Sequence, residues 1–498
     1  MSSERLTYRF GPLERRGILG PVRAAQAVVI GAGGLIAIAI IDGSPSATGA
    51  VAATLVFGVC VVLAVIPVGR RTAEEWAPIV GFYTIRRLGG AARFRSGAAT
   101  SGNVASGLRS RHPLLALPVP RPPSSLRGVR IAETAYRDRP IGILTSERGR
   151  RAVAVLACRV IAFSLLDADA QERRLGRWGL VLSSAAGTPI RRIQWVERTV
   201  PAQGDELARW VGAERDPAVP LRGTPMIDSY LELIGTTARV TQEHEILVAV
   251  EVDSRRVRER GNDAVARALI EQTERVAQGL EAAEVSVLGA LAPGQLARAL
   301  RTSFDPYARS ELAALETADP DAARLSEASA WPLGAREAWD HYRSDGALHA
   351  TYWIGGWPRV DVSPMFMDAL LGRSSAVRTV AVTFEPLSPE RSTREVEAAV
   401  TRDRADRELR HRFGQSETAR QRQAEEATVR REAELAAGHG EVRLAGFVTV
   451  TGRDTDDLRR ACAEVHEHAA RARLELHRMY GQQADAFTFT LPLCRGLR

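Results

Sequence analysis

The chain carries the stretch Ala24-Ala-Gln-Ala-Val-Val-Ile-Gly-Ala-Gly-Gly-Leu-Ile-Ala-Ile-Ala-Ile-Ile41, an apolar run without a charged side chain, and a second such run extends from Thr48 to Val68. As α-helices the runs would be about 27 Å and about 31 Å long, close to the hydrocarbon thickness of a bilayer. Between them, Asp42-Gly-Ser-Pro-Ser46 supplies turn formers and room only for a tight return. The pattern predicts a transmembrane helical hairpin with spans at about 24–41 and 48–68.

Arginines flank the two runs and are missing from the turn that joins them. They are Arg5, Arg9, Arg15, Arg16 and Arg23 before the first run, and Arg70, Arg71, Arg86 and Arg87 after the second. Because positive charge favours the cytoplasmic side, we predict a multi-pass plasma-membrane protein whose termini and soluble domains are cytoplasmic. Two alternatives stay open: a secretory signal peptide in the first run, and a buried hairpin of a soluble core.

Small residues recur four positions apart within the runs. Side chains of this size allow two helix backbones to approach closely. The residues predicted to form this packing face of the hairpin are Ala27, Gly31, Gly33, Ala37, Gly49 and Ala53.

All the basic residues are arginines. The 498 residues include 67 Lys and Arg against 59 Asp and Glu, and no lysine occurs among them. A P-loop lysine and a lysine Schiff base are therefore excluded. The formal net charge of +8 suits anionic lipid as well as nucleic acid. Four cysteines without paired spacing predict neither a zinc site nor a disulfide framework.

Composition and periodicity divide the chain into successive segments. Alternating strand and helix patterns predict two α+β cytoplasmic domains joined by a boundary segment. The predicted order is a membrane hairpin with an interfacial helix at 1–90, a disordered Pro, Ser and Arg linker at 91–127, a first domain at 128–304, the boundary at 305–330 and a second domain at 331–498.

The second domain has two features that specify its fold. The segment 388–437 is dense in Arg and Glu, which predicts long charged helices. A strand at 441–451, a helix at 454–480 and a strand at 484–491 are typical of ferredoxin-like β-α-β units. The predicted fold class is therefore α+β with an N-terminal transmembrane helical hairpin.

The sequence offers no catalytic set. It contains no GxxxxGK[ST], GxSxG or HExxH motif, so we expect no enzyme activity, no cofactor and no metal site. His466 and His468 are two apart on a predicted helix and point to different faces. Asp340, His341 and His349 offer one alternative, an acid-base site of a hydrolase, but without a nucleophile motif.

The segment Ile190–Thr199 is predicted to be a strand with a strongly basic polar side. Its notable residues are Arg191, Arg192, Trp195 and Arg198. Either this side is a partner or nucleic-acid surface, or it is the solvated face of a sheet.

Four stretches resemble the actinobacterial PrgI-type, or SCO-type, conjugation membrane proteins. They are Tyr8-Arg-Phe-Gly-Pro-Leu-Glu-Arg-Arg-Gly17, Ile193-Gln-Trp-Val-Glu-Arg-Thr199, His341 to Trp353, and Tyr480 to Leu493. The N-terminus resembles PrgI, a small membrane component of conjugative type IV secretion. The soluble part resembles the N-terminal region of the VirB-class secretion ATPase, and we expect the motor domain to be missing because the chain ends at Arg498.

The resemblance implies a function without catalysis. It implies a membrane-anchored adaptor of a conjugative type IV secretion apparatus that docks a separately encoded ATPase. The predicted partners also include the lipid bilayer and a second copy of the chain. The alternative is a membrane-tethered nucleic-acid-binding protein that guides the transferred DNA.

Overall fold

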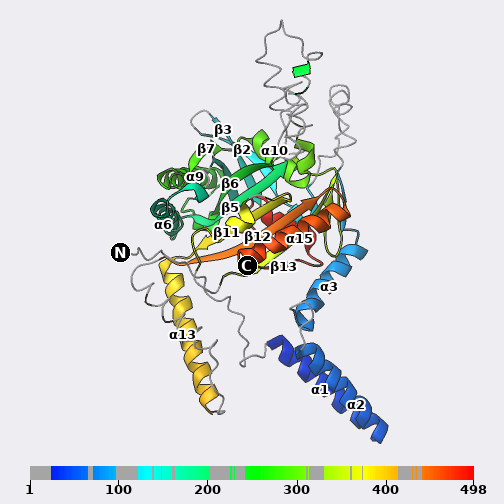
Figure 1. Cartoon of the computed structure of the whole chain (residues 1–498). Helices are drawn as coiled ribbons and strands as arrows, with labels where there is room; N and C mark the ends of the chain where they lie inside the picture. Colours follow the sequence, from blue (N-terminus) through cyan, green and yellow to red (C-terminus); the bar gives the residue numbers. More distant parts are fainter. Residues whose placement is uncertain are drawn as a thin grey trace.

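The computed structural model describes residues 24–65, 71–96, 122–201, 242–309, 330–412 and 440–497, with short gaps at 137–138, 147–148, 160–162, 260, 359–361 and 373, and a few isolated positions elsewhere. A pair of helices projects from a body that is built on one large sheet (Figure 1). Much of the predicted linker, of the boundary segment and of 413–437 lies outside the described residues, as do Tyr8 to Gly17.

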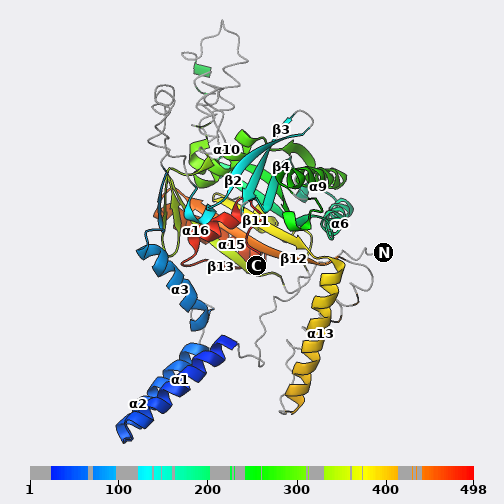
Figure 2. The same cartoon turned by 180° about the vertical axis from the view of Figure 1, so that it is seen from behind.

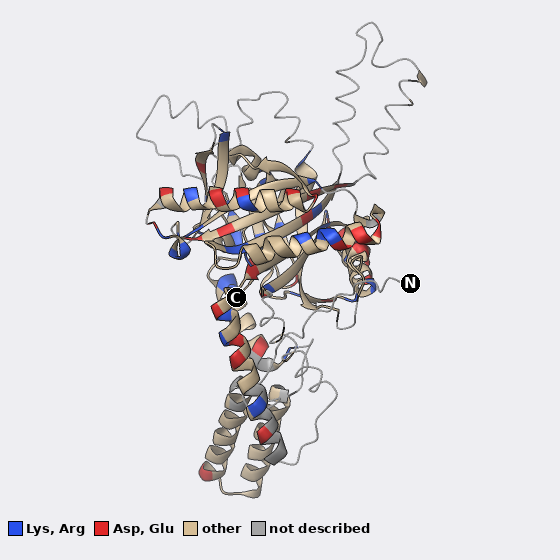
Figure 3. Ribbon diagram, turned by 90° about the vertical axis from the view of Figure 1, so that its left-hand side faces the viewer, with Lys and Arg blue, Asp and Glu red and all other residues tan. Residues whose placement is uncertain are grey.

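The projecting pair consists of α1 (Ala24–Gly43) and α2 (Ala47–Val65). The helices pack most closely at Gly33, where an added Cβ would lie 2.6 Å from the Cβ of Cys60. Near the other end, Gln26 Nε2 donates a hydrogen bond to the Ala64 carbonyl at 2.9 Å. The pair is drawn almost entirely without charged residues (Figure 3). Its outward side chains are large and exposed: Val28, Leu35, Ile36, Ile38, Ile41, Val51, Leu55, Phe57, Val59 and Val62.

The prediction that these helices span a membrane is wrong. Among the helices that the structure describes, none combines the length and the apolar character needed to cross a bilayer.

The body contains a 13-stranded sheet in which every strand pair is antiparallel. The strand order is β1-β8-β9-β10-β12-β11-β5-β6-β4-β3-β2, with β13 beside β10 and β7 beside β4. The strands are β1 (Arg93–Arg95), β2 (Arg130–Tyr136), β3 (Arg139–Ser146), β4 (Arg151–Arg159), β5 (Ile190–Pro201), β6 (Gln242–Asp253), β7 (Ser286–Ala290), β8 (Gly334–Glu337), β9 (Tyr342–Ser344), β10 (Ala347–Gly356), β11 (Val377–Pro386), β12 (Val442–Gly452) and β13 (Glu475–Arg478).

Eight strands of the sheet form two halves that follow the same chain path, and β1, β2, β3, β8 and β9 extend its edges. The first half runs β4, α6 (Ala168–Ser184), β5, β6, α9 (Asn262–Ala282) and β7, with the strands side by side as β7-β4-β6-β5. The second half repeats this path as β10, α12 (Asp368–Leu371), β11, β12, α15 (Thr455–Arg471) and β13, with the strands side by side as β13-β10-β12-β11. The halves join where β5 pairs with β11.

One face of the sheet, here called the helix face, is covered by α6, α9, α12 and α15, of which Figure 1 labels α6, α9 and α15. The helix α15 shows why these segments fold as they do. Asp454 caps it by accepting hydrogen bonds from the main-chain nitrogens of Asp456 and Asp457. Its buried residues Leu458, Ala461, Cys462, Val465 and Ala469 recur at helical spacing and pack against Val448 and Val450 of β12.

The opposite face, here called the tail face, is covered by α10 (Pro293–Phe304) and by the C-terminal tail, residues 483–497. The tail contains α16 (Gln483–Phe487) and the 3₁₀ turn η6 (Thr488–Thr490). Both lie against the sheet, as seen from behind in Figure 2. Between β11 and β12, α13 (Pro389–Arg412) leaves the body as a charged helix (Figure 2).

The predicted fold class is corrected to a large antiparallel sheet with helices on both faces. Each half has the strand order of a split β-α-β unit, but the halves form one continuous sheet instead of the predicted ferredoxin-like units behind a transmembrane hairpin. The predicted strand at 484–491 is α16 and η6. The strand that completes the second half is β13, which lies inside the predicted helix at 454–480, because α15 ends before Arg473 with its φ of 56°.

Candidate interaction site

The helix α3 (Ala73–Leu88) joins the projecting pair to the body. Trp76, Ile79, Tyr83 and Arg86 are spaced three, four and three apart, which places them on one face of the helix. Ile79 and Tyr83 are buried against the body. The face that points away carries Phe82, Ile85 and Leu88, which are exposed: 67 %, 67 % and 83 % of their surface is accessible. The helix therefore has one face fixed to the body and one apolar face without cover among the described residues.

Aromatic rings hold the N-terminal part of α3. Trp76 stacks on Trp339 with ring centroids 5.9 Å apart, and Tyr83 meets the same indole edge-on at 5.1 Å. Tyr480, which follows β13, stacks on Trp339 at 6.4 Å and lies 6.3 Å from Trp76. Three segments that are far apart in the sequence thus meet in one cluster, and each aromatic pair adds about 0.5–1.5 kcal/mol beyond the area it buries.

Arg86 fixes the C-terminal part of α3 with three contacts. It donates to Asp485 Oδ2 at 2.5 Å, to the Gly481 carbonyl at 2.7 Å and to Glu337 Oε1 at 3.2 Å. Glu337 also accepts from the main-chain nitrogen of Ala484 at 3.1 Å. Burial raises the pKa of Glu337, although Arg86 opposes this shift. The guanidinium therefore ties α3 to both β8 and the C-terminal tail.

Gly481 makes this arrangement possible. Its φ of 67° lies in the left-handed region, and an added Cβ would come 2.6 Å from the Trp339 ring. Its main-chain nitrogen donates to the Trp339 carbonyl at 2.7 Å. A larger residue here would be strained and would displace the indole on which α3 rests.

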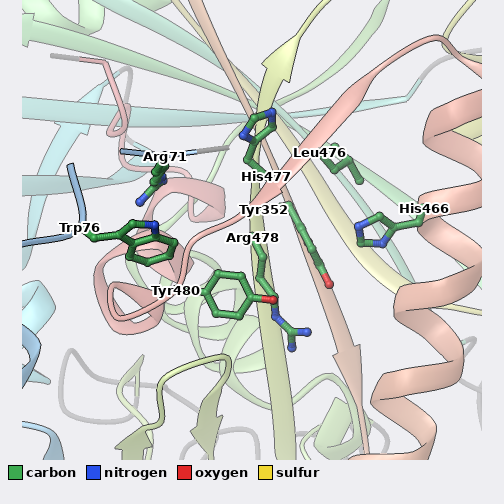
Figure 4. A pocket seen from close by; sticks show the side chains of 8 residues that line it. All are labelled: Arg71, Trp76, Tyr352, His466, Leu476, His477, Arg478 and Tyr480. Carbon is green, nitrogen blue, oxygen red and sulfur yellow. The ribbon is translucent and has the colours of Figure 1, made fainter. Parts of the chain in front are cut away.

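A cavity of about 250 Å³ lies beside the aromatic cluster. Figure 4 shows that Arg71 and Trp76 approach it from the α3 side, Arg478 and Tyr480 from β13 and its continuation, and His466 from α15. Arg478 donates through Nε to the Asp340 carbonyl at 2.8 Å. Its guanidinium lies 5.6 Å from the ring of Tyr352 and 5.8 Å from that of Tyr480. Cationic and aromatic side chains thus line one cavity at the docked end of α3.

The predicted basic surface on β5 lies mostly inside the molecule. Arg192 is 4 % exposed and donates to Glu385 and to the carbonyls of Cys494 and Leu497. Arg198, 2 % exposed, donates to Glu245 and to Thr302 of α10. Burial accordingly lowers the pKa of Arg198.

Two further residues of that predicted surface also have partners within the protein. Arg191 is half-buried and pairs with Asp253 at 3.0 Å. Trp195 packs against the aliphatic residues of the helix face. A partner or nucleic-acid surface needs exposed side chains, and these positions do not provide one.

The candidate hydrolase residues do not assemble a site. His341 Nδ1 lies 2.8 Å from Asp340 Oδ1 at the surface. His349 is completely buried on the tail face, where Thr451 lies 2.9 Å from Nδ1 and the Phe304 carbonyl lies 3.0 Å from Nε2. Burial lowers the pKa of His349 to about 4. This imidazole is a neutral structural group without access to a substrate.

No metal centre is found in the part of the chain that the structure describes, where no group of three or more His, Cys, Asp or Glu side chains could hold an ion. The four cysteines are all unpaired thiols. His466 contacts the Cys462 carbonyl through Nδ1 at 2.8 Å and turns toward the cavity.

The predicted small-residue packing face is only partly at the contact of α1 and α2. Gly33 and Ala53 are buried. Around Gly31 no atom lies within 4 Å of an added Cβ. Gly49 instead packs on the turn, with the Ser44 carbonyl 2.1 Å from an added Cβ. Ala37 is half-buried, and Ala27 lies in α1 with its side-chain surroundings outside the described residues.

Sequence reasoning missed the docking of α3. The sequence predicts only an interfacial helix within residues 1–90, with Arg86 among the arginines that follow the second apolar run. The available signal was the three-four-three spacing of Trp76, Ile79, Tyr83 and Arg86, which mixes aromatic, aliphatic and basic groups on one face.

A comparison with family models gives one match, and none of the curated proteins matches the chain. Residues 240–354 match the family described as "Putative type VII ESX secretion system translocon, EccE". The match covers 115 of the 498 residues. It runs from β6 through α9 and α10 into β10, so it includes strands of both halves and the residues Glu337 and Trp339 that receive α3.

The match overturns the resemblance to conjugation proteins. Of the four stretches that carried that resemblance, only His341 to Trp353 lies within the matched residues. The stretch Tyr480 to Leu493 is packed into the body, with Phe487 and Leu491 buried on the tail face. The match therefore contradicts the conjugative type IV apparatus, its ATPase partner and the alternative role in DNA guidance, and it points to a component of a type VII secretion system.

The predicted membrane location is consistent with a translocon family, but no described helix spans the bilayer. Over its matched segment, the chain is similar to a component of the type VII ESX secretion translocon.

Proposed function

We propose that this protein is a membrane-associated structural component of a type VII secretion translocon. The observation that carries the proposal is the match of residues 240–354 to the EccE family, together with the way this segment receives α3. Its partners in this proposal are other components of the same secretion system.

The proposed role of the body is that of a rigid scaffold. The two halves share one sheet through the β5 and β11 pair, and side chains are buried on both faces of that sheet. A continuous hydrogen-bonded sheet resists bending between its halves. A force that acts on one half is therefore transmitted to the other. A catalytic role is not part of the proposal, because the candidate acid-base residues are separated by the burial of His349.

The proposed role of α1 and α2 is contact with lipid. Exposed Leu35, Leu55 and Val59 belong to an apolar surface much larger than isolated surface residues would give. Arg86 and the aromatic cluster fix α3, the helix that follows this pair, to the body. The free thiols fit a reducing compartment, so we place the body on the cytoplasmic side of the plasma membrane.

The test is recovery of the full chain from a cell that carries an ESX system. The tagged protein is expected in the membrane fraction and, after mild solubilisation, in a complex with other ESX components. Arg86→Ala should reduce recovery of that complex severalfold, because α3 loses three contacts. Arg87→Ala, the exposed neighbour, should not. Recovery in the soluble fraction without ESX components would contradict the proposal.

A further inference from the structure

The cavity at the docked end of α3 has the composition of an anion site. Its walls carry two guanidinium groups, from Arg71 and Arg478, and the imidazole of His466. Tyr352, Tyr480 and Trp76 supply flat apolar walls (Figure 4). The groups come from α3 and its preceding residues, from β10, from α15 and from β13, so they approach the space from different directions.

Arg478 is held in a way that keeps its terminal nitrogens available. Its Nε is used by the Asp340 carbonyl at 2.8 Å, and its flat face is supported by Tyr352 and Tyr480. The nearest carboxylate to a terminal nitrogen is Asp340 Oδ2 at 3.8 Å, which is longer than a hydrogen bond. Asp340 is itself shared with His341 at 2.8 Å. The guanidinium is thus oriented by aromatic faces and by the main chain, and Asp340 forms an ion pair with it that is longer than a hydrogen bond.

A phosphate group fits this set of donors better than a carboxylate does. A single guanidinium fork satisfies a planar carboxylate. A phosphate presents three or four oxygens in different directions, and arginine on several sides is the usual solution for it. A cavity of about 250 Å³ also leaves room for part of the group that the phosphate esterifies, against the aromatic walls.

We propose that this cavity binds a phosphate group, either free or as the ester of an anionic lipid headgroup. The lipid source is favoured by position, because Arg71 and Trp76 belong to the segment that connects the apolar pair α1 and α2 to the body. Tyrosine and tryptophan beside arginine is also the composition of protein surfaces at the headgroup layer. The lipid source rests on the proposed membrane association.

The test uses the full-length protein in a non-ionic detergent, titrated by calorimetry with short-chain ligands. The probes are dihexanoyl phosphatidic acid, inorganic phosphate and dihexanoylglycerol, which lacks the phosphate. Phosphatidic acid is expected to bind and dihexanoylglycerol is not. Arg478→Gln and, independently, Arg71→Gln should weaken binding at least about tenfold. Arg459→Gln, exposed on α15, is the matched control and should bind as the wild type does. Unfolding midpoints within the error of the wild type show that the variants are folded.

The outcomes separate the two sources. Binding of phosphatidic acid alone supports a lipid headgroup, binding of inorganic phosphate alone supports a free phosphate, and binding of both supports a site for the phosphate group itself. The proposal is overturned if neither binds, or if both arginine variants bind as tightly as the wild type. Membrane recovery and capture of ESX components are measured on the same variants. Absence of phosphate binding with normal capture would overturn this inference alone. Phosphate binding without capture of ESX components would overturn only the proposed function.

Discussion

The helix face and the tail face cover the same sheet with different chemistry. On the helix face, Val448, Val450 and their neighbours meet the aliphatic side of α15. On the tail face, the alternate strand positions carry polar groups that are buried nonetheless, among them Arg192, Gln194 and Thr449. These groups bond to the C-terminal tail: Gln194 donates to the Phe489 carbonyl and accepts from the Cys494 nitrogen, both at 2.8 Å.

The difference shows two ways in which a face of a sheet can be covered. A long amphipathic helix buries enough apolar surface for the hydrophobic effect to keep it on the sheet. The tail is only fifteen residues long, and short 3₁₀ and loop segments leave main-chain groups that need partners. Buried side chains on the strands supply these partners, so the tail is held by directional bonds. If this account is right, loss of a polar group should be more costly on the tail face than loss of a methyl group on the helix face.

The largest effect is expected for Arg192→Ala. Removing this guanidinium leaves Glu385 buried and leaves the carbonyls of Cys494 and Leu497 without their donor. Breaking a buried ion pair from one side costs about 3–5 kcal/mol of unfolding free energy. The measurement is urea unfolding, with Ile193→Val on the helix face costing about 0.5–1.5 kcal/mol. Equal losses in the two variants would contradict the difference between the faces.

A second effect is expected from the buried imidazole of His349, and it depends on pH. Its pKa falls from 6.5 to about 4 on folding. The stabilisation is therefore present above pH 6.5 and is lost as the pH falls toward 4, by up to roughly 3 kcal/mol. The difference in unfolding free energy between wild type and His349→Gln should shrink over this window.

The pH dependence of the wild type alone would not isolate His349, because Glu251 affects stability in the opposite direction over a similar pH range. The comparison with His349→Gln removes the contribution of Glu251. Burial raises the pKa of Glu251 to about 7, against the pull of three nearby arginines. The contribution of Glu251 to the unfolding free energy is present below pH 4.5 and is lost as the pH rises to 7. A pH-independent difference between wild type and His349→Gln would show that the imidazole is not buried as described.

The smallest change in unfolding free energy is expected from two reciprocal substitutions at adjacent positions of β12, one on each face of the sheet. Thr449 links the hydroxyls of Thr351 and Thr490, each at 2.8 Å. Thr449→Val should cost about 1–2 kcal/mol, since it removes both bonds. Val448→Thr puts an unpartnered hydroxyl into the apolar helix face and should cost about 1–3 kcal/mol. Urea unfolding measures both, and a stabilising result for either exchange would break the comparison.

The two faces also differ in how far the sequence predicts them. The periodic apolar positions of α15 and the cap at Asp454 predict its helix. Arg192 and Arg198 indicate a solvated strand face because burial of arginine needs partners that the local sequence does not reveal. Those partners lie at Glu385, at Thr302 and in the tail, far away in the sequence.

The same limitation explains the errors about the site and the N-terminal helices. The spacing on α3 is readable, but Trp339 and Gly481 come from distant segments, so the docking could not be inferred locally. The charge-free runs predict the helices α1 and α2 correctly as helices. The inference that they cross a bilayer is the part that the structure contradicts, since no described helix is long and apolar enough.

The most direct test of the proposed function is secretion by a cell whose own copy of this protein has been deleted. The amount of ESX substrate in the medium is measured by quantitative mass spectrometry. We predict that secretion is lost and is restored by the wild-type chain. Undiminished secretion in the deletion strain would contradict a role in the type VII translocon.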